Sequence, residues 1–295
     1  MEIEELKQVC VIGSGQMGHQ IAMLCALGGF RTHLQDVDAG ALDKAKASLH
    51  SRMDQWVQKN KVSAADRDAA FERLNFTTSL EEAASSADLV IEAVVEKLSV
   101  KREVFSQLEQ IAPRHAILAT NSSTIVSSKL SDVTTRPDKV CNMHFFFPPL
   151  VMDCVEVVMS EQTSEETAQL ALAVCDRIGR TGVLLRKEIS GFVANRILGA
   201  LQREAMQLYE AGVADFKDID IICRKALNHP IGPFELMDLS GNDVAYFVMQ
   251  QQYEETGDPA LKPFPSVEEK VKLGHLGRKT GKGWYDYTDN GGKRG

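Results

Sequence analysis

Short apolar runs alternate with longer stretches of helical character along the first two thirds of the chain. Apolar runs of this length, bounded by polar residues, are typical of buried strands, and helices between them favour parallel pairing. A charged helical stretch is expected at 41–74 and another helix at 166–178. The pattern therefore predicts a doubly wound, mostly parallel α/β sheet. Its expected strands are 8–12, 30–35, 87–94, 116–121, 139–144 and 181–185.

From residue 191 onward the apolar positions recur at helical spacing. Phe192, Ile197 and Leu201 begin this series. Residues three and four apart share one face of a helix, so this part of the chain is predicted to be all α. We expect two domains, a parallel-sheet domain at residues 1–187 and an all-α C-terminal domain at residues 188–295.

Composition and charge narrow the class of protein. The 295 residues suit two domains, and the hydrophobic fraction of 44% suits a folded chain. A net charge of −8 offers no basic surface, so we expect no nucleic-acid partner. The six cysteines lie mostly in apolar runs without a C-x-x-C pair, which favours free thiols in a reducing compartment. No apolar run has the length of a membrane span and no secretory signal is visible, so we expect a cytoplasmic protein without a membrane partner.

A glycine-rich turn follows the first expected strand and opens the first helix. In this context the first glycine permits the tight turn, the second lets the backbone approach a pyrophosphate, and the third lets helix pack on strand. Helix N–H groups then point at phosphate. The stretch predicts a Rossmann-like dinucleotide site that includes Gly13, Gly15, Gln16, Met17 and Gly18.

An acidic residue at the end of the second expected strand bears on the choice of cofactor. Asp36 lies eighteen residues beyond Gly18. A carboxylate there accepts hydrogen bonds from the ribose hydroxyls and would repel a 2′-phosphate. Val37 and Asp38 supply no arginine to offset that repulsion. We therefore expect NAD rather than NADP. The alternative is that there is no dinucleotide site, only a glycine-rich turn followed by a solvated aspartate.

One histidine and one glutamate stand in an otherwise largely apolar stretch. His144 ends an expected strand, and Glu156 follows twelve positions later, beyond a turn at Pro148 and Pro149. An alcohol dehydrogenation needs a proton acceptor, and histidine titrates near neutral pH. A carboxylate on the other ring nitrogen would hold one tautomer. The pattern predicts a His144–Glu156 pair, and the alternative is that His144 only hydrogen-bonds a loop while Glu156 faces water.

Further polar residues lie just beyond the ends of expected strands, where ligands bind in sheets of this kind. They are Glu96, Asn121, Ser122 and Ser123. Either serine would also suit the cap of a helix that starts near Ile125, and capping is compatible with chemistry.

Seven stretches, taken in order, resemble one known family. They are GSGQMG, IEAVVEKLSVKREVF, TNSSTI, HFFFPPLVMDCVEVV, GFVANRI, HPIGPFELMDLSGND and GRKTGKGWYDY. Their order and spacing resemble those of the L-3-hydroxyacyl-CoA dehydrogenases, which include bacterial 3-hydroxybutyryl-CoA dehydrogenases. The resemblance implies an NAD-dependent enzyme of fatty-acid β-oxidation that interconverts an L-3-hydroxyacyl-CoA, of short chain, and the 3-oxoacyl-CoA. It also implies a homodimer formed by the helical domain, with an acyl-CoA substrate.

The same resemblance implies roles for single residues. His144 would be the general base and Glu156 its orienting partner. Ser123 would hydrogen-bond the reacting oxygen, and Asn195 would hold the substrate carbonyl or the developing enolate-like charge. No metal is implied. The positions that match cofactor contacts are Glu96, Lys101, Ser123 and Lys279.

Plainer interpretations stand beside some of these roles. Asn195 in an apolar helix would otherwise be a satisfied core amide, and Lys101 one more solvated charge. The aromatic run 145–147 is interpreted as core and cleft wall. Lys59 is only a loose match for a lysine that meets the CoA phosphates.

Two positions depart from the family pattern. Phe147 stands where HFFNP carries Asn, and Asp153 stands where relatives carry Lys. Asp153 would alter the electrostatics of the base if it points inward and would mean little if it points outward. The alternatives are a sugar-acid or carnitine dehydrogenase of the same superfamily, and a non-catalytic NAD-binding protein. The β-hydroxyacid dehydrogenases are disfavoured because residues 191–195 offer no lysine.

Overall fold

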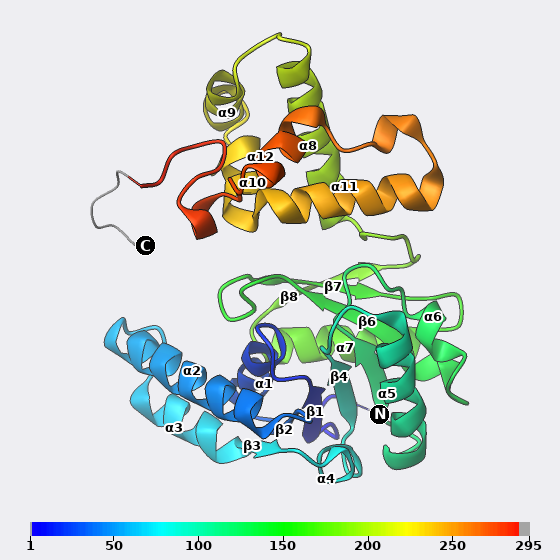
Figure 1. Ribbon diagram of the computed structural model, residues 1–295. Helices are drawn as coiled ribbons and strands as arrows, with labels where there is room; N and C mark the ends of the chain where they lie inside the picture. Colours follow the sequence, from blue (N-terminus) through cyan, green and yellow to red (C-terminus); the bar gives the residue numbers. More distant parts are fainter. Residues whose placement is uncertain (1, 289–295) are drawn as a thin grey trace. The chain divides into compact units, whose positions relative to one another are not determined.

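The computed structural model describes residues 2–288, which form two compact units that divide between Phe192 and Val193 (Figure 1). This division lies five residues beyond the expected domain boundary at residue 187. Residues 289–295, the end of the expected second domain, lie outside the described residues. The unit that ends at Phe192 is called unit 1 below, and the unit that begins at Val193 is called unit 2.

Unit 1 is built on an eight-stranded sheet within the described residues, in the order β3-β2-β1-β4-β5-β6-β7-β8. Every neighbouring pair in it is parallel except β6 and β7, which are antiparallel. The predicted mostly parallel sheet is confirmed. The strands are β1 (Gln8–Ile12), β2 (Arg31–Gln35), β3 (Leu74–Thr77), β4 (Leu89–Glu92), β5 (Ile117–Thr120), β6 (Val140–Phe145), β7 (Cys154–Val158) and β8 (Thr181–Leu185).

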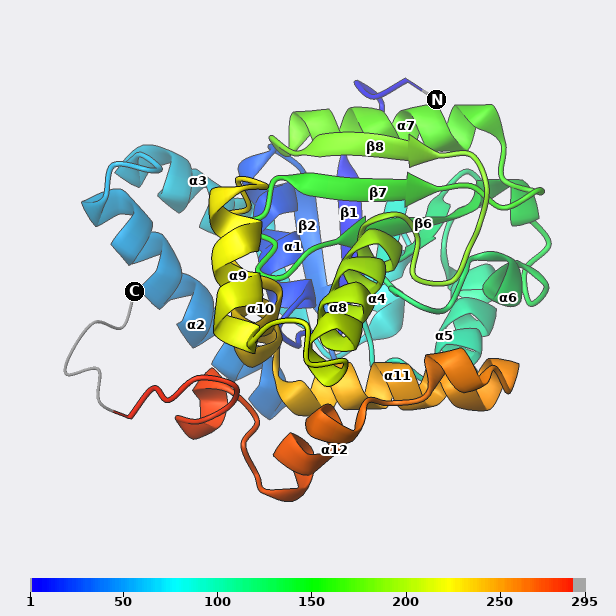
Figure 2. The ribbon, with the colours of Figure 1, turned by 90° about the horizontal axis from the view of Figure 1, so that it is seen from above.

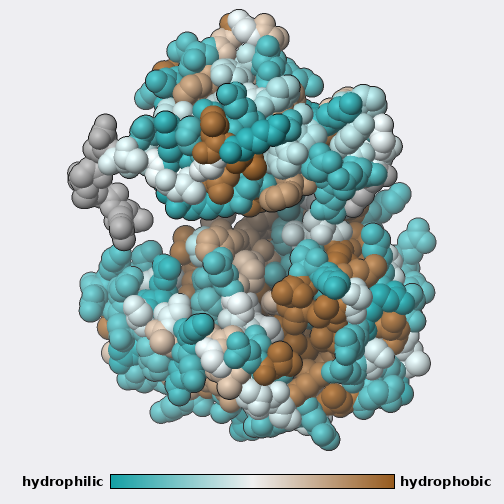
Figure 3. All heavy atoms as spheres, in the orientation of Figure 1, coloured by the Kyte–Doolittle hydropathy of each residue, from teal (hydrophilic) through white to brown (hydrophobic). Residues whose placement is uncertain are grey.

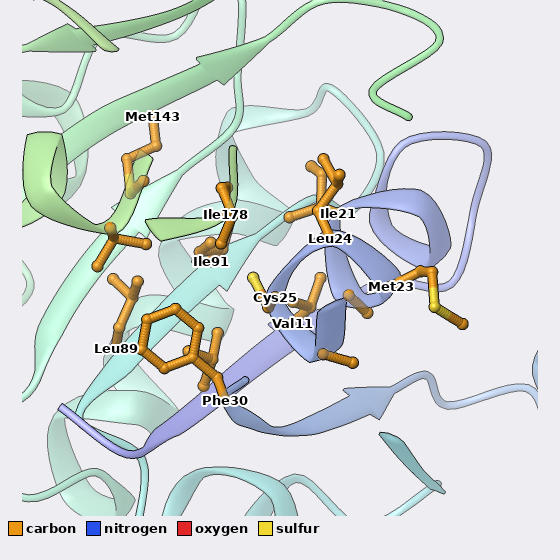
Figure 4. Packing of buried hydrophobic residues seen from close by; sticks show 14 of the residues in the cluster. Val11, Ile21, Met23, Leu24, Cys25, Phe30, Leu89, Ile91, Met143 and Ile178 are labelled. Carbon is orange, nitrogen blue, oxygen red and sulfur yellow. The ribbon is translucent and has the colours of Figure 1, made fainter. Parts of the chain in front are cut away.

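Helices pack on both faces of this sheet because successive strand residues point to opposite sides. Val9 and Val11 of β1 belong to one buried cluster that includes side chains of α1 and α7, and Figure 4 shows Val11 packed among those of α1. Cys10 and Ile12 belong to a second cluster, with side chains of α4 and α5. Helix α7 lies against β7 and β8 (Figure 2). The helices of unit 1 are α1 (Gly18–Leu27), α2 (Ala39–Gln58), α3 (Ala64–Arg73), α4 (Leu80–Ala84), α5 (Leu98–Ile111), α6 (Ser128–Ser131), the short 3₁₀ helix η1 (Pro137–Lys139) and α7 (Glu165–Arg177).

The expected helical stretch at 41–74 is confirmed, but it consists of two helices and gives way to a strand at Leu74. Helix α2 ends at Gln58, and Asn60 adopts a left-handed conformation with φ 54°, which terminates it. Helix α3 begins after Ser63, whose hydroxyl accepts from the backbone N–H of Asp66 at 3.0 Å. The chain then forms β3, a four-residue edge strand that pairs with β2. The strand is too short for its apolar pattern to stand out from the helix before it.

Unit 2 is helical in its described residues, as predicted, with two isolated bridges near its end. Its core includes Met206, Phe234, Met237 and Trp284. No helix in the described part of the chain is long and apolar enough to cross a membrane. The helices are α8 (Ala194–Glu210), α9 (Phe216–Lys225), α10 (Pro233–Ser240), α11 (Asn242–Thr256), α12 (Pro265–Lys272) and the short 3₁₀ helices η2 (Pro259–Leu261) and η3 (Arg278–Thr280).

A buried carboxylate, Asp238, ties the last described segment to the core of unit 2. It accepts hydrogen bonds from the backbone N–H groups of Trp284 at 2.8 Å and Tyr285 at 2.9 Å. A side chain at Gly283 would collide with this carboxylate, so the turn requires glycine there. A charge that is 1% exposed must be hydrogen-bonded in this way to remain buried.

Candidate active site

The glycine-rich turn between β1 and α1 has the geometry that its sequence predicts. Gly13 has φ 95°, and a Cβ there would lie 2.7 Å from the carbonyl oxygen of Ala93. A Cβ on Gly18 would collide with the carbonyl of Gly13, so the third glycine allows close packing. A Cβ on Gly15 would meet no described heavy atom within 4 Å, so packing does not require this glycine. Its backbone is therefore open to close approach by a ligand.

Helix α1 begins without a described side-chain cap. The N–H groups of His19 and Gln20 bond to backbone carbonyls, whereas those of Met17 and Gly18 have no described acceptor and are available to an anion. Gln16 is exposed and Met17 is half-buried at this end. Gln20, in the first turn, donates to the carbonyl of Gln16 at 3.1 Å and accepts from the backbone N–H of Leu150 at 3.3 Å. This buried amide joins the glycine-rich turn to the β6–β7 connection.

Asp36 follows β2 and is turned toward the glycine-rich turn. Its carboxylate accepts from the backbone N–H of Ser14 at 2.7 Å and from the Ser14 hydroxyl at 2.8 Å. Partial burial alone would raise the pKa of Asp36, but hydrogen bonds from Ser14 and from the N–H of Asp38 lower it below the ordinary value. The group is ionised at neutral pH, as ribose binding requires. Ser14 was not among the predicted site residues, although its place between Gly13 and Gly15 was a usable signal.

His144 and Glu156 are brought together by the one antiparallel pairing in the described sheet. They lie directly opposite each other on β6 and β7, so their side chains share a face. His144 Nδ1 donates to Glu156 Oε2 at 2.8 Å, and the two residues are 5% and 3% exposed. The predicted pair is confirmed, and the alternative in which Glu156 faces water is wrong. Since Nδ1 carries the proton, Nε2 of the neutral ring is left as an acceptor.

Two aromatic rings pack beside the imidazole of His144. The ring of Phe146 lies 4.7 Å away in an edge arrangement, and that of Phe192 lies 5.4 Å away. Phe145 is buried in the core, as expected, whereas Phe147 is 58% exposed. The exposed ring of Phe147 leaves an apolar surface three residues from the histidine.

The segment after β5, residues 122–127, carries Ser123 and is not helical. The helix expected near Ile125 is wrong, because α6 begins at Ser128. Ser122 does accept from the N–H of Ile125 at 2.8 Å, but it also donates to Glu96. Side chains take up the N–H groups of this segment, which therefore do not bond to carbonyls one turn back. Ser123 is half-buried in the middle of it.

The side chain of Asn142, on β6, hydrogen-bonds the Ser123 segment and so fixes it to the sheet. Its side-chain oxygen accepts from the N–H of Ser127 at 2.8 Å, and its amide nitrogen donates to the carbonyls of Ile125 at 3.1 Å and Ser122 at 3.3 Å. Asn142 is fully buried and shares a face of β6 with His144, two residues on. Sequence reasoning missed it, because an asparagine inside an apolar strand is a signal only when its partners are known.

Glu96 and Lys101 belong to a buried ionic network under the same segment. Lys101 Nζ lies 2.8 Å from Glu92 and 3.2 Å from Glu96. Lys101 is 1% exposed, so its interpretation as a solvated charge is wrong. Burial would raise the pKa of Glu96, but the hydrogen bond from Ser122 and the charge of Lys101 lower it. Glu96 also accepts from the Thr124 hydroxyl at 2.8 Å.

Other predicted residues lie elsewhere. Lys59 is exposed at the end of α2 in unit 1. Asn195 is exposed on the first turn of α8, so its interpretation as a core amide is wrong. Lys279 pairs with Asp243 at 2.6 Å within unit 2. Asp153 is exposed and accepts from the Thr181 hydroxyl at 2.9 Å, which corresponds to the outward alternative.

Both units match domains of one known enzyme family. Residues 8–189 match the 3-hydroxyacyl-CoA dehydrogenase, NAD binding domain, and residues 191–287 match the 3-hydroxyacyl-CoA dehydrogenase, C-terminal domain. The chain belongs to the 3-hydroxyacyl-CoA dehydrogenase family. The predicted family, the NAD cofactor and the assignment as an enzyme are thereby confirmed.

Individual members of the 3-hydroxyacyl-CoA dehydrogenase family resemble this chain over nearly its whole length. A probable 3-hydroxybutyryl-CoA dehydrogenase of Bacillus subtilis is 37% identical, covering 97% of this chain and 99% of the relative. A 3-hydroxybutyryl-CoA dehydrogenase of Clostridioides difficile is also 37% identical, covering 95% and 99%. The crystal structure of (S)-3-hydroxybutyryl-CoA dehydrogenase PaaH1 from Ralstonia eutropha has a TM-score of 0.89 at 36% identity, covering 96% and 100%.

Proposed function

We propose that this protein interconverts a short-chain L-3-hydroxyacyl-CoA, such as 3-hydroxybutyryl-CoA, and the 3-oxoacyl-CoA, with His144 as the general base. The observation that carries this proposal is the buried hydrogen bond from His144 Nδ1 to Glu156. No described residue hydrogen-bonds to Nε2 of the same ring, which leaves it for a substrate hydroxyl. The relatives named 3-hydroxybutyryl-CoA dehydrogenase support the substrate.

In the proposed reaction, His144 Nε2 takes the proton of the C3 hydroxyl while that carbon gives up a hydride. Bound NAD supplies the hydride acceptor. Glu156 keeps the proton on Nδ1 and stabilises the imidazolium that forms. In the reverse direction the imidazolium returns its proton to the new alkoxide. Ser123 is proposed to hydrogen-bond the reacting oxygen, and Asn195 to hold the substrate carbonyl.

The cofactor residues proposed for unit 1 fit the chemistry of NAD. Gly15 leaves room for backbone contact with a pyrophosphate, next to Gln16 and Met17, while Gly13 and Gly18 permit the tight packing of the turn, and the ionised Asp36 suits ribose hydroxyls. Glu96 remains 40% exposed at its side chain, so a polar ligand can reach it. Ser123 and Lys279 complete the proposed cofactor contacts, and Lys59 is proposed to meet the CoA phosphates. Lys101 is 1% exposed and is proposed to act on the cofactor through Glu96.

We also propose a homodimer formed through unit 2. Several of its large apolar side chains are exposed in the single chain, including Ile197 at 65%, Ile222 at 54% and Phe247 at 63%. Figure 3 shows apolar residues on the visible face of both units. Exposed apolar surface is costly in water and commonly marks an interface.

We propose that the protein is cytoplasmic, as expected for a chain with unpaired thiols. Cys10, Cys25 and Cys141 are buried free thiols, and burial raises the pKa of each to about 12. They are therefore packed as apolar groups and do not form disulfides in the structure.

The deciding experiment is NADH oxidation by the purified protein with acetoacetyl-CoA, compared with free acetoacetate. We expect turnover with acetoacetyl-CoA and none with acetoacetate. Turnover on a 3-oxo acid without CoA would replace this proposal by a non-CoA dehydrogenase. NADH binding without turnover on any 3-oxo substrate would replace it by a binding-only role. The exposed ring of Phe147 is the feature that makes it necessary to test acetoacetyl-CoA and free acetoacetate side by side.

A further inference from the structure

We propose that Phe192 is a positioning residue of this site. Its ring would hold the imidazole of His144 in the orientation that keeps Nδ1 hydrogen-bonded to Glu156. The proposal rests on the proposed function of His144. Phe192 is the last residue of unit 1, and its ring is fully buried 5.4 Å from the imidazole. It would act through the base and not on the substrate.

The backbone of Phe192 adopts a conformation that costs free energy for a residue with a side chain. Phe192 has φ 46° and follows Gly191 at φ 76°. A bulky L-residue rarely adopts this left-handed conformation, and such residues cluster at functional sites when the surrounding structure over-determines them. Glycine would satisfy this backbone without strain, yet a phenylalanine occupies it and points into the unit.

Packing defines where the ring goes. Phe192 forms a small buried cluster with Val158 of β7 and Leu185 of β8, against which Val126 of the Ser123 segment packs. The buried cluster that includes this ring therefore packs against the Ser123 segment through Val126, and the ring itself lies beside the imidazole of His144.

The segment that delivers Phe192 is anchored at its other end. Glu188 accepts from the Ser127 hydroxyl and from the N–H of Ser128, both at 2.8 Å. The N–H of Phe192 donates to the carbonyl of Ile189 at 3.0 Å, which closes a turn between Glu188 and Phe192. Residues 188–192 are thus tied by Glu188 to the end of the Ser123 segment and the start of α6, and Phe192 closes the turn.

The imidazole needs this support because one hydrogen bond does not fix a ring. The bond to Glu156 defines the position of Nδ1, but the ring can still tilt about that contact. Two rings pack beside the imidazole, Phe146 in an edge arrangement at 4.7 Å and Phe192 tilted at 5.4 Å, and both would limit its tilt. Loss of one ring would permit tilting and admit water beside Glu156, and small misplacements of a reacting group are costly in rate.

The test is Phe192→Leu, with Phe30→Leu as the matched control. Phe30 is equally buried in the cluster shown in Figure 4, but it lies before β2, and Arg177 packs over its ring. We expect Phe192→Leu to lower kcat by about tenfold or more, with KM for acetoacetyl-CoA and the Kd for NADH within about threefold of wild type. Phe30→Leu should lower the melting temperature and leave kcat within about twofold of wild type. Phe192→Met replaces Phe192→Leu if the latter fails to fold.

A second measurement keeps this inference separable from the proposed function. The ring-nitrogen resonances of His144, assigned with His144→Gln, report the Nδ1–H bond to Glu156 whether or not acetoacetyl-CoA is turned over. We expect this resonance to broaden or shift in Phe192→Leu and to stay unchanged in Phe30→Leu. An unchanged His144 resonance in Phe192→Leu, or an equal loss of kcat in both variants, would overturn the role of Phe192.

Discussion

At the scale of single residues, His144 has its two ring nitrogens in different environments. Nδ1 is committed to a buried carboxylate, and no described residue hydrogen-bonds to Nε2. Because Glu156 is 3% exposed, water screens its charge weakly, and the interaction with a developing imidazolium is strong. The buried pair is therefore suited to a proton transfer whose charged product must be stabilised inside the protein.

Replacing Glu156 by Gln tests this point. The amide can still accept the hydrogen bond but no longer carries the charge that stabilises an imidazolium, so kcat with acetoacetyl-CoA should fall by about 100-fold or more. Glu161→Gln, an exposed glutamate in the turn after β7, should leave kcat within about twofold of wild type. The measurement is steady-state NADH oxidation at pH 7. Equal rates for Glu156→Gln and wild type would remove Glu156 from the mechanism.

At the scale of elements, the Ser123 segment is positioned by side chains and has no regular structure of its own. Glu96 accepts a hydrogen bond from Ser122 at the start of this segment. At its end, Asn142 accepts from the N–H of Ser127 and Glu188 accepts from the Ser127 hydroxyl. These three residues come from the β4–α5 connection, from β6 and from the segment after β8. Such convergence fixes a loop before any ligand arrives, which reduces the ordering cost of binding.

The pH dependence of stability follows from Glu96. Its folded pKa lies below its ordinary value of 4.5, because Ser122 and Lys101 outweigh burial. A carboxylate with a lowered pKa stabilises the fold above its unfolded pKa, and this contribution is lost as pH falls through the folded pKa. Glu96→Gln should therefore be less stable than wild type at pH 7, with the difference shrinking below about pH 4.5.

Urea unfolding at several pH values measures this difference. Glu103→Gln, an exposed glutamate on α5, serves as the control and should match wild type throughout. A stability difference for Glu96→Gln that stays constant from pH 7 to well below pH 4.5, at about pH 3, would contradict the assigned cause.

At the scale of the whole molecule, the proposed cofactor-binding, catalytic and dimerisation residues are distributed over both units. Unit 1 holds the glycine-rich turn, Asp36 and the His144–Glu156 pair, whereas unit 2 carries Asn195, Lys279 and much of the exposed apolar surface. Polar networks around Asp220 and Asp238 hold unit 2 together. Asp220 accepts from the N–H of Phe234 at 2.9 Å and from the hydroxyl of Tyr285 at 2.8 Å. A helical unit built in this way can present apolar helix faces to a second copy.

The homodimer is tested by Ile222→Glu and Phe247→Glu in unit 2. A charge at an apolar interface loses its hydration without gaining a partner, so at least one of the two should shift the protein toward monomer. Sedimentation velocity at micromolar concentration measures the change. Val37→Glu, at a 90% exposed apolar residue of unit 1, should leave the mass unchanged. A monomeric wild-type protein would refute the dimer.

Much of the fold was predictable from sequence because its signals are local. The strand that runs into Gly13 and the helical spacing after Gly191 each report on neighbouring residues, as does the placement of His144 and Glu156 on either side of a proline turn. The edge strand β3 and the start of α6 were not predictable in this way. Their residues are fixed by β2 in one case and by Glu96 and Asn142 in the other.

The amino-acid sequence by itself determined the parallel strands that lead to the glycine-rich turn and to His144, the helical second unit, and the placement of His144 and Glu156 on either side of a proline turn. Tertiary structure alone decided that Lys101 is buried between two carboxylates, that Asn142 and Glu188 hold the Ser123 segment, and that Phe192 packs beside His144. The physical reason is sequence separation. A hydrophobic period or a turn is set by adjacent residues, whereas the burial and partners of a polar side chain depend on groups tens of residues away that meet only when the chain folds.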